Sequence, residues 1–105
     1  MLTTFEVLAQ PTRRSILDEL RVGECLVGDI AQRTAIAQPL ASKHLRVLRD
    51  AGLVTVRIDG PRRWYRIRPE PLAEIDDWLE PYRWMWESSL DALGAHLDEM
   101  PDHDA

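Results

Sequence analysis

The chain has 105 residues, of which 45% are hydrophobic and 30% are charged, and this composition argues for one folded domain rather than a disordered chain. No run of about 18 apolar residues offers a membrane span, and the N-terminal charges stand in the wrong order for a secretory signal. The single cysteine, Cys25, excludes an intrachain disulfide and a cysteine-cluster zinc site. We therefore expect a cytoplasmic protein in a reducing compartment, with no membrane partner.

Charge is divided unevenly along the chain. Residues 1–68 hold 12 basic and 7 acidic residues, whereas residues 69–105 hold one arginine and 11 acidic residues. The overall net charge of −5 therefore hides a basic first part and an acidic second part. A basic surface suits a polyanionic partner, although two solvated surfaces would have the same composition.

Apolar residues recur at helical spacing three times in the first third of the chain. This spacing predicts short helices over residues 2–9 and 27–33, and a longer helix from Pro11 to about Leu20. Proline suits the first turn of a helix, where its missing N–H costs little. Gly23 follows at the place where the longer helix is expected to end.

A fourth helix is predicted over residues 38–51, with Pro39 in its first turn. Ala41, Leu45 and Leu48 form an apolar stripe along it. The other side of the same helix is polar and basic. We therefore expect a helix with one buried and one exposed face.

The period of the sequence changes after this helix. Two runs within residues 54–68 alternate in the manner of β-strands, and turn residues at 59–61 separate them. This pattern predicts a hairpin with an arginine-rich tip.

Residues 70–100 return to helical spacing, but Pro81 conflicts with one regular helix. We therefore expect a short segment over residues 72–75, a break or kink near 76–81, and a long helix over about 77–98. Residues 101–105 are expected to form a frayed acidic tail.

The order of these elements predicts a mainly α fold with a small β-hairpin, which is typical of a single winged helix-turn-helix domain over residues 1–100. In this fold the second helix of the pair enters the major groove of DNA, where side chains near its start reach base edges. Basic residues beside it suit phosphate contacts, which set affinity and register. His44 fits either a phosphate contact or the boundary between helix and hairpin. The residues expected at double-stranded DNA are Gln38, Pro39, Ser42, Lys43, His44, Arg46, Arg49, Arg13, Arg14, Arg62 and Arg63.

Three runs of sequence support this interpretation by resemblance. AQPLASKHLRVLRDAGLV, followed by GPRRWYRI, closely resembles the recognition helix and wing of ArsR-type (arsenical-resistance repressor) regulators, and PTRRSILDEL resembles their second helix. PLAEIDDWLEPYRWMWESSLDAL is similar to the last helix of a branch whose members often lack a metal site. The resemblance covers about residues 3–98 and implies a homodimeric bacterial repressor.

Two positions depart from the pattern of the family. Ala37 stands where members commonly have a Ser or Thr that caps the recognition helix. The metal-sensing members carry Cys-Val-Cys-Asp on the preceding helix, whereas residues 26–29 here are Leu-Val-Gly-Asp. We therefore expect no metal site and no cofactor.

The resemblance places the dimer face on the first and last helices. Trp78, Trp84 and Trp86 lie too close together in the sequence to share one face of one helix. The large apolar residues of the last helix form a stripe that suits an interface. The residues expected in the dimer interface are Leu2, Phe5, Tyr82, Trp86, Leu90, Leu93 and Leu97.

Three alternatives remain open from the sequence. The chain could be a winged-helix protein-interaction module without DNA binding. It could also be a repressor switched by metal or redox chemistry at Cys25, although Cys25 fits a small buried hydrophobe better. His96, Glu99 and His103 could contribute to a metal site only if a dimer completed the ligand set. An enzyme is disfavoured because no catalytic constellation is visible, and the effector, if one exists, is unknown.

Overall fold

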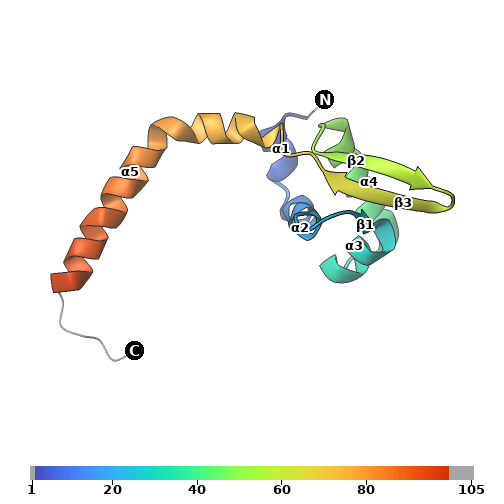
Figure 1. Ribbon diagram of the computed structural model, residues 1–105, viewed down its shortest axis with the longest axis horizontal. Coiled ribbons are helices and arrows are strands. Elements are labelled where there is room, and N and C mark those ends of the chain that lie inside the picture. The colour runs from blue at the N-terminus through green and yellow to red at the C-terminus, as the bar shows by residue number, and fades with distance from the viewer. Residues whose placement is uncertain (1, 100–105) are drawn as a thin grey trace. The chain divides into compact units, whose positions relative to one another are not determined.

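The computed structural model describes residues 2–99, without the side chains of Ala92 and residues 95–99. Its backbone divides into two compact units, one up to Ile75 and one from Asp76 onward. Along the chain the elements are α1 (Thr4–Leu8), α2 (Pro11–Leu20), β1 (Cys25–Leu26), α3 (Val27–Thr34), α4 (Gln38–Asp50), β2 (Val54–Asp59), β3 (Arg62–Ile67) and α5 (Leu72–Glu99) (Figure 1).

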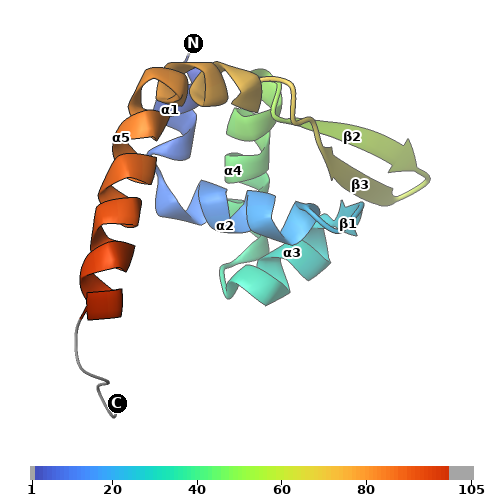
Figure 2. The same cartoon turned by 60° about the vertical axis from the view of Figure 1, so that its left-hand side comes forward.

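The first unit has the predicted winged helix-turn-helix fold, in which the helices α1 to α4 pack together and the β2–β3 hairpin extends from them (Figure 2). The predicted starts of α2, α3 and α4 are confirmed, whereas α1 begins at Thr4 rather than at residue 2. Thr3 and Glu6 form a capping box at α1, and Pro11 occupies the first turn of α2 behind the Gln10 cap. These local devices fix the helix starts.

One hydrophobic core holds this unit together. The predicted apolar stripe of α4 is fully buried in it, which confirms the expected two-faced helix. Close packing of aliphatic side chains from helices and hairpin supplies most of the stabilising burial. Its largest fully buried side chains are Val7, Ile16, Leu20, Ile30, Leu45, Leu48, Leu53 and Val54.

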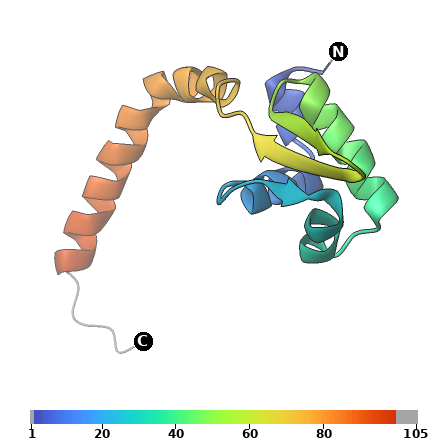
Figure 3. The same ribbon diagram turned by 45° about the vertical axis from the view of Figure 1, so that its right-hand side comes forward.

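The hairpin belongs to a three-stranded antiparallel sheet rather than standing alone. The strand order is β1-β3-β2, and β1 lies beside β3 with Cys25 opposite Tyr65 and Leu26 opposite Trp64 (Figure 3). β1 was not predicted, because a strand of two residues is too short to show a periodicity. The predicted hairpin itself is confirmed.

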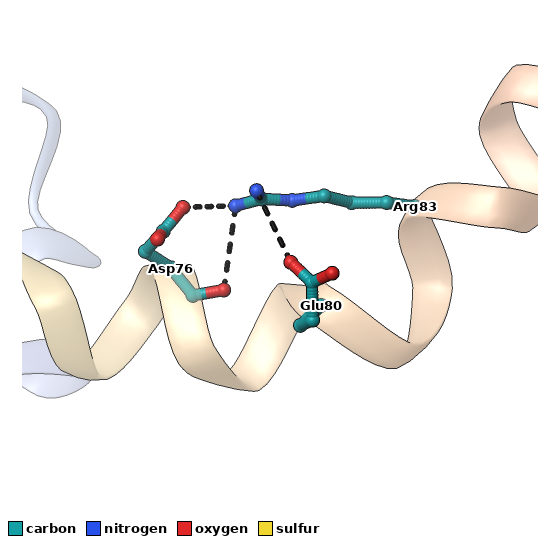
Figure 4. Close-up of polar contacts among 3 residues, drawn as sticks. All are labelled: Asp76, Glu80 and Arg83. Carbon is teal, nitrogen blue, oxygen red and sulfur yellow. Dashed lines mark hydrogen bonds and ion pairs between the residues drawn. The ribbon is translucent and has the colours of Figure 1, made fainter.

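Of the break or kink expected near residues 76–81, the break is wrong, because α5 runs continuously from Leu72 to Glu99 with Pro81 inside it. Proline removes one backbone hydrogen bond, but Arg83 ties together the turns on either side of it. Its guanidinium group donates to the carboxylate and the backbone carbonyl of Asp76 and forms an ion pair with Glu80 at 3.3 Å (Figure 4). Interactions of this kind offset part of the cost of an internal proline.

The large apolar side chains from Trp78 to Leu93 are exposed in the single chain, except that of Leu79, which is half-buried. The rings of Trp78 and Tyr82 contact each other, with centroids 5.2 Å apart. Leu97 and the proposed ligands His96 and Glu99 have side chains outside the described part, as does all of His103 and the predicted tail. Across residues 2–99, none of the helices combines the length and apolarity that a bilayer crossing requires.

Candidate nucleic-acid interface

The helix pair α3 and α4 carries the candidate interface, and a tight turn sets the angle between its members. Ala35 ends α3 in the left-handed conformation, with φ of 58°, and Ile36 N donates to Ala31 O at 3.1 Å. Ala37 then precedes α4 without a side-chain cap, as the sequence predicted. The N–H groups of Leu40 and Ala41 nevertheless donate to Ala37 O, both at 3.0 Å, and Pro39 has no N–H to satisfy.

The polar face of α4 points to solvent. Its exposed side chains include those of the residues expected to contact bases and phosphates, which are Gln38, Pro39, Ser42, Lys43, Arg46 and Arg49. A helix that exposes such a face beside a hairpin has the dimensions to enter a major groove.

A polar groove of about 350 Å³ runs between this face and the hairpin. The structure therefore brings together one amide, two hydroxyl groups and three guanidinium groups. The residues that line the groove are Val27, Gln38, Ser42, Leu45, Arg46, Arg49, Pro61, Arg63 and Tyr65.

The three arginines of the groove carry uncompensated charge. Within residues 2–99, ion pairs of arginine join Arg57 to Glu24, Arg68 to Glu70, and Arg83 to Asp76 and Glu80. Arg46, Arg49 and Arg63 are in none of them. Positive charge without an internal partner attracts an anion from solution.

The hairpin tip separates its two arginines. Asp59 lies opposite Arg62, and the strands are joined by Gly60 and Pro61, with Gly60 in the left-handed region at φ 59°. Because successive side chains alternate across a strand, Arg63 lines the groove and Arg62 points to the other face of the sheet. The sequence placed both arginines at one tip without distinguishing their faces.

The two arginines at the start of α2 stabilise the end of α1. Arg13 Nε donates to Val7 O and Arg14 Nη1 donates to Leu8 O, both at 2.7 Å. These bonds satisfy carbonyl groups at the end of a short helix. Each guanidinium group keeps further N–H donors for another acceptor.

His44 lies outside the groove and is half-buried on α4. Burial lowers the pKa of its imidazole, and the positive charges of Arg13 and Lys43 lower it further. In the free chain these effects therefore disfavour the charged form of the ring.

Cys25 is buried at the start of β1, where Arg33 contacts it. Arg33 Nη1 lies 3.5 Å from Cys25 Sγ, and the thiol faces the carbonyls of Glu19 and Gly23 at 3.6 Å. This contact could not be predicted from the sequence, because Arg33 stands eight residues away on α3. In the part of the chain that the structure describes, no group of three His, Cys, Asp or Glu residues could hold a metal.

Comparison with known proteins agrees with this architecture. Residues 10–56 match the family described as bacterial regulatory protein, arsR family. An HTH-type transcriptional regulator of Mycobacterium tuberculosis is 34% identical over 98 residues, covering 93% of this chain and 89% of that protein. An arsenical resistance operon repressor of Staphylococcus aureus is 36% identical over 73 residues, covering 70% of each chain. The chain belongs to the ArsR family of transcriptional regulators.

Solved structures of ArsR-family proteins have the same fold. The crystal structure of a possible transcriptional regulator for arsenical resistance is 39% identical, with a TM-score of 0.71, and covers 96% of this chain and 100% of its own. The solution structure of a homodimeric winged helix-turn-helix DNA-binding domain from Mycobacterium bovis is 31% identical, with a TM-score of 0.61. It covers 94% of this ArsR-family chain and 82% of its own.

Proposed function

We propose that this ArsR-family chain is a homodimeric repressor that binds an inverted-repeat operator in double-stranded DNA, without catalysis and in the cytoplasm. The observation that carries the proposal is the groove between α4 and the hairpin, which combines Gln38 and Ser42 with unpaired arginines. Such a groove offers base-reading groups and phosphate-binding groups side by side.

The side chains divide into two tasks in this proposal. Gln38 reads an adenine edge through two hydrogen bonds, and Ser42 and Lys43 contact neighbouring base edges or phosphates. Arg46 and Arg49 bind phosphates along the major groove, and the hairpin acts as the wing, where Arg62 and Arg63 bind the adjacent backbone.

A dimer follows from the exposed apolar stripe of α5. Tyr82, Trp86, Leu90 and Leu93 are exposed in the single chain, and leaving such a surface in water is unfavourable. Leu2 and Phe5 of the N-terminal region are also exposed, and we assign them, with Leu97, to the same interface. Two-fold symmetry would place two α4 helices about one DNA turn apart, roughly 34 Å, on an inverted repeat.

We also propose that no metal or other cofactor controls this repressor. Residues 26–29 hold no cysteine, and Gly28 lies beside the recognition helix, where an added Cβ would stand 3.8 Å from Gln38 Oε1. Zinc, cadmium and arsenite at low micromolar concentration should leave the DNA complex intact, and Cys25→Ser should bind nearly as wild type. Metal-specific release that Cys25→Ser abolishes would replace this proposal with a switch at Cys25.

Selection of duplexes from a random library, followed by fluorescence anisotropy, tests DNA recognition. The selected duplex should contain an inverted repeat and bind at least about a thousandfold more tightly than a scrambled duplex of equal length. Affinity should fall steeply as salt rises, because counterions are released from the DNA. Equal affinity for both duplexes would contradict the proposal, and no binding to either would favour a protein-interaction module.

A further inference from the structure

The hairpin has two faces with different charge environments. Arg63 and Tyr65 line the groove, so strand alternation puts Trp64 and Arg66 on the opposite side, which we call the outer face of the wing. Arg57 of β2 lies opposite Trp64 in the ladder and shares this outer face.

Arg57 makes two contacts there. Its Nε donates to Glu24 Oε2 at 3.1 Å, and its guanidinium carbon lies 5.6 Å from the centre of the Trp64 ring. The first contact is a charge-assisted hydrogen bond, and the second is within the range of a cation–π interaction. Arg57 therefore joins the segment before β1 to the centre of the hairpin.

The Arg57 contacts lie at the base of the free part of the hairpin. Trp64 is the last residue toward the tip at which β3 also pairs with β1, through Leu26. Beyond it, the ladder pairs Ile58–Arg63 and Asp59–Arg62 have only each other, and the Ile58 side chain is 68% exposed. The Glu24–Arg57 contact therefore stands where the hairpin leaves the body of the unit.

We infer that Glu24 and Arg57 are positioning residues that hold the wing at the angle at which Arg63 reaches DNA, and that Arg57 does not itself bind a phosphate. The inference rests on the proposed DNA binding. It assigns a role to an acidic residue, Glu24, that electrostatic attraction to DNA alone would disfavour.

Charge-reversal variants distinguish the two possible roles of Arg57, which are to position the wing or to bind a phosphate. E24R makes the protein more positive, so plain attraction to DNA predicts tighter binding, whereas a broken Glu24–Arg57 ion pair predicts binding about two- to fivefold weaker. R57E should weaken binding more than R66E does. R66E is the matched control, because Arg66 lies on the same face and is in no ion pair within residues 2–99.

The double variant E24R/R57E restores the opposite charges in exchanged positions and should bind within about threefold of wild type. Tighter binding by E24R, or a double variant no better than R57E alone, would overturn the inference. Wild-type protein that fails to bind the selected duplex would instead refute the proposed function.

Circular dichroism would show whether a charge reversal unfolds the protein. In that case the milder variants E24Q and R57Q replace it in the test. Their effects on affinity should be non-additive, because both remove the same ion pair. R57Q should leave the slope of log K against log salt unchanged, whereas R63Q should reduce it by about 1. A slope reduced by R57Q as much as by R63Q would show that Arg57 neutralises a phosphate and would overturn the inference.

Discussion

Apolar side chains up to Ile75 are mostly buried within their own unit, whereas those from Asp76 onward are mostly exposed. Ile16, Leu45 and Leu48 have no exposed surface, but Trp84 and Leu90 are each 64% exposed. The first unit thus contains the core that its fold needs. The second is a helix whose burial requires a further surface, and we propose that a second chain supplies it.

The two units also differ in how their basic side chains are paired with acidic ones. Among the described residues the arginines of the groove have no ion-pair partner, whereas Arg83, the single arginine after Arg68, contacts two acids. The arginines of the groove therefore suit the first unit to bind the phosphates of DNA. The acidic residues of the other suit the solvated rim of an interface.

The largest expected effect comes from placing charge on the apolar stripe. Leu90→Glu with Leu93→Glu should give monomers or unfolded chains, and affinity for the full operator should fall about a hundredfold or more, because the half-sites no longer act together. Sedimentation and anisotropy would measure both. Trp84→Glu is the matched control, since Trp84 is as exposed as Leu90 but lies on the other side of the helix. If the Leu90→Glu/Leu93→Glu variant is still a dimer, the proposed interface is wrong.

Removing the base-reading groups should have the next largest effect. Gln38→Ala should weaken specific binding about tenfold or more and relax base preference, because alanine cannot form the bidentate pair with the adenine edge. Lys43→Ala should weaken binding with little change in preference, since Lys43 lies outside the groove. Gln32→Ala, exposed on α3, is the control. A Gln38/Lys43 double alanine variant that binds its operator as wild type does would show that α4 docks differently.

The wing arginines should act on all DNA sequences alike. Arg62→Ala and Arg63→Ala should each flatten the slope of log K against log salt by about 1 for every phosphate that the arginine neutralises. Because Arg63 lines the groove and Arg62 faces away, we expect the larger change for Arg63. An unchanged slope in the double variant would mean that the wing does not touch the DNA backbone.

The smallest effect concerns stability of the first unit. Ala35 holds a left-handed backbone that is strained for alanine and that glycine adopts freely, so Ala35→Gly should raise the free energy of unfolding by about 0.5–1 kcal/mol. Ala9→Gly is the control, because Ala9 ends α1 with φ of −66° and glycine there adds only chain entropy. Chemical denaturation should show a higher free energy of unfolding for Ala35→Gly and a lower one for Ala9→Gly.

The sequence predicted the elements that have a clear period. Ala41, Leu45 and Leu48 marked the buried face of α4, and alternation with turn residues marked the hairpin. It missed β1, whose two residues are defined only by pairing with β3. The break that the sequence allowed near residues 76–81 is wrong, because the rule for an internal proline took no account of Arg83, which reaches back across Pro81 to Asp76.

The candidate site was predictable in composition but not in arrangement. The residues of α4 share a face by helical spacing, so Gln38, Ser42, Arg46 and Arg49 could be grouped in advance. Interactions between segments that are distant in the sequence could not be predicted in this way. Arg33 on Cys25 and Glu24 on Arg57 join residues 8 and 33 positions apart, which only the folded chain brings together.

Sedimentation of the wild-type protein, alone and with duplexes carrying one or two half-sites, tests the central claim most directly. We predict a dimer at micromolar concentration, two chains on the full inverted repeat, and affinity for a single half-site at least about a hundredfold lower. A protein that is monomeric at that concentration and binds a single half-site as tightly as the full operator would contradict the account.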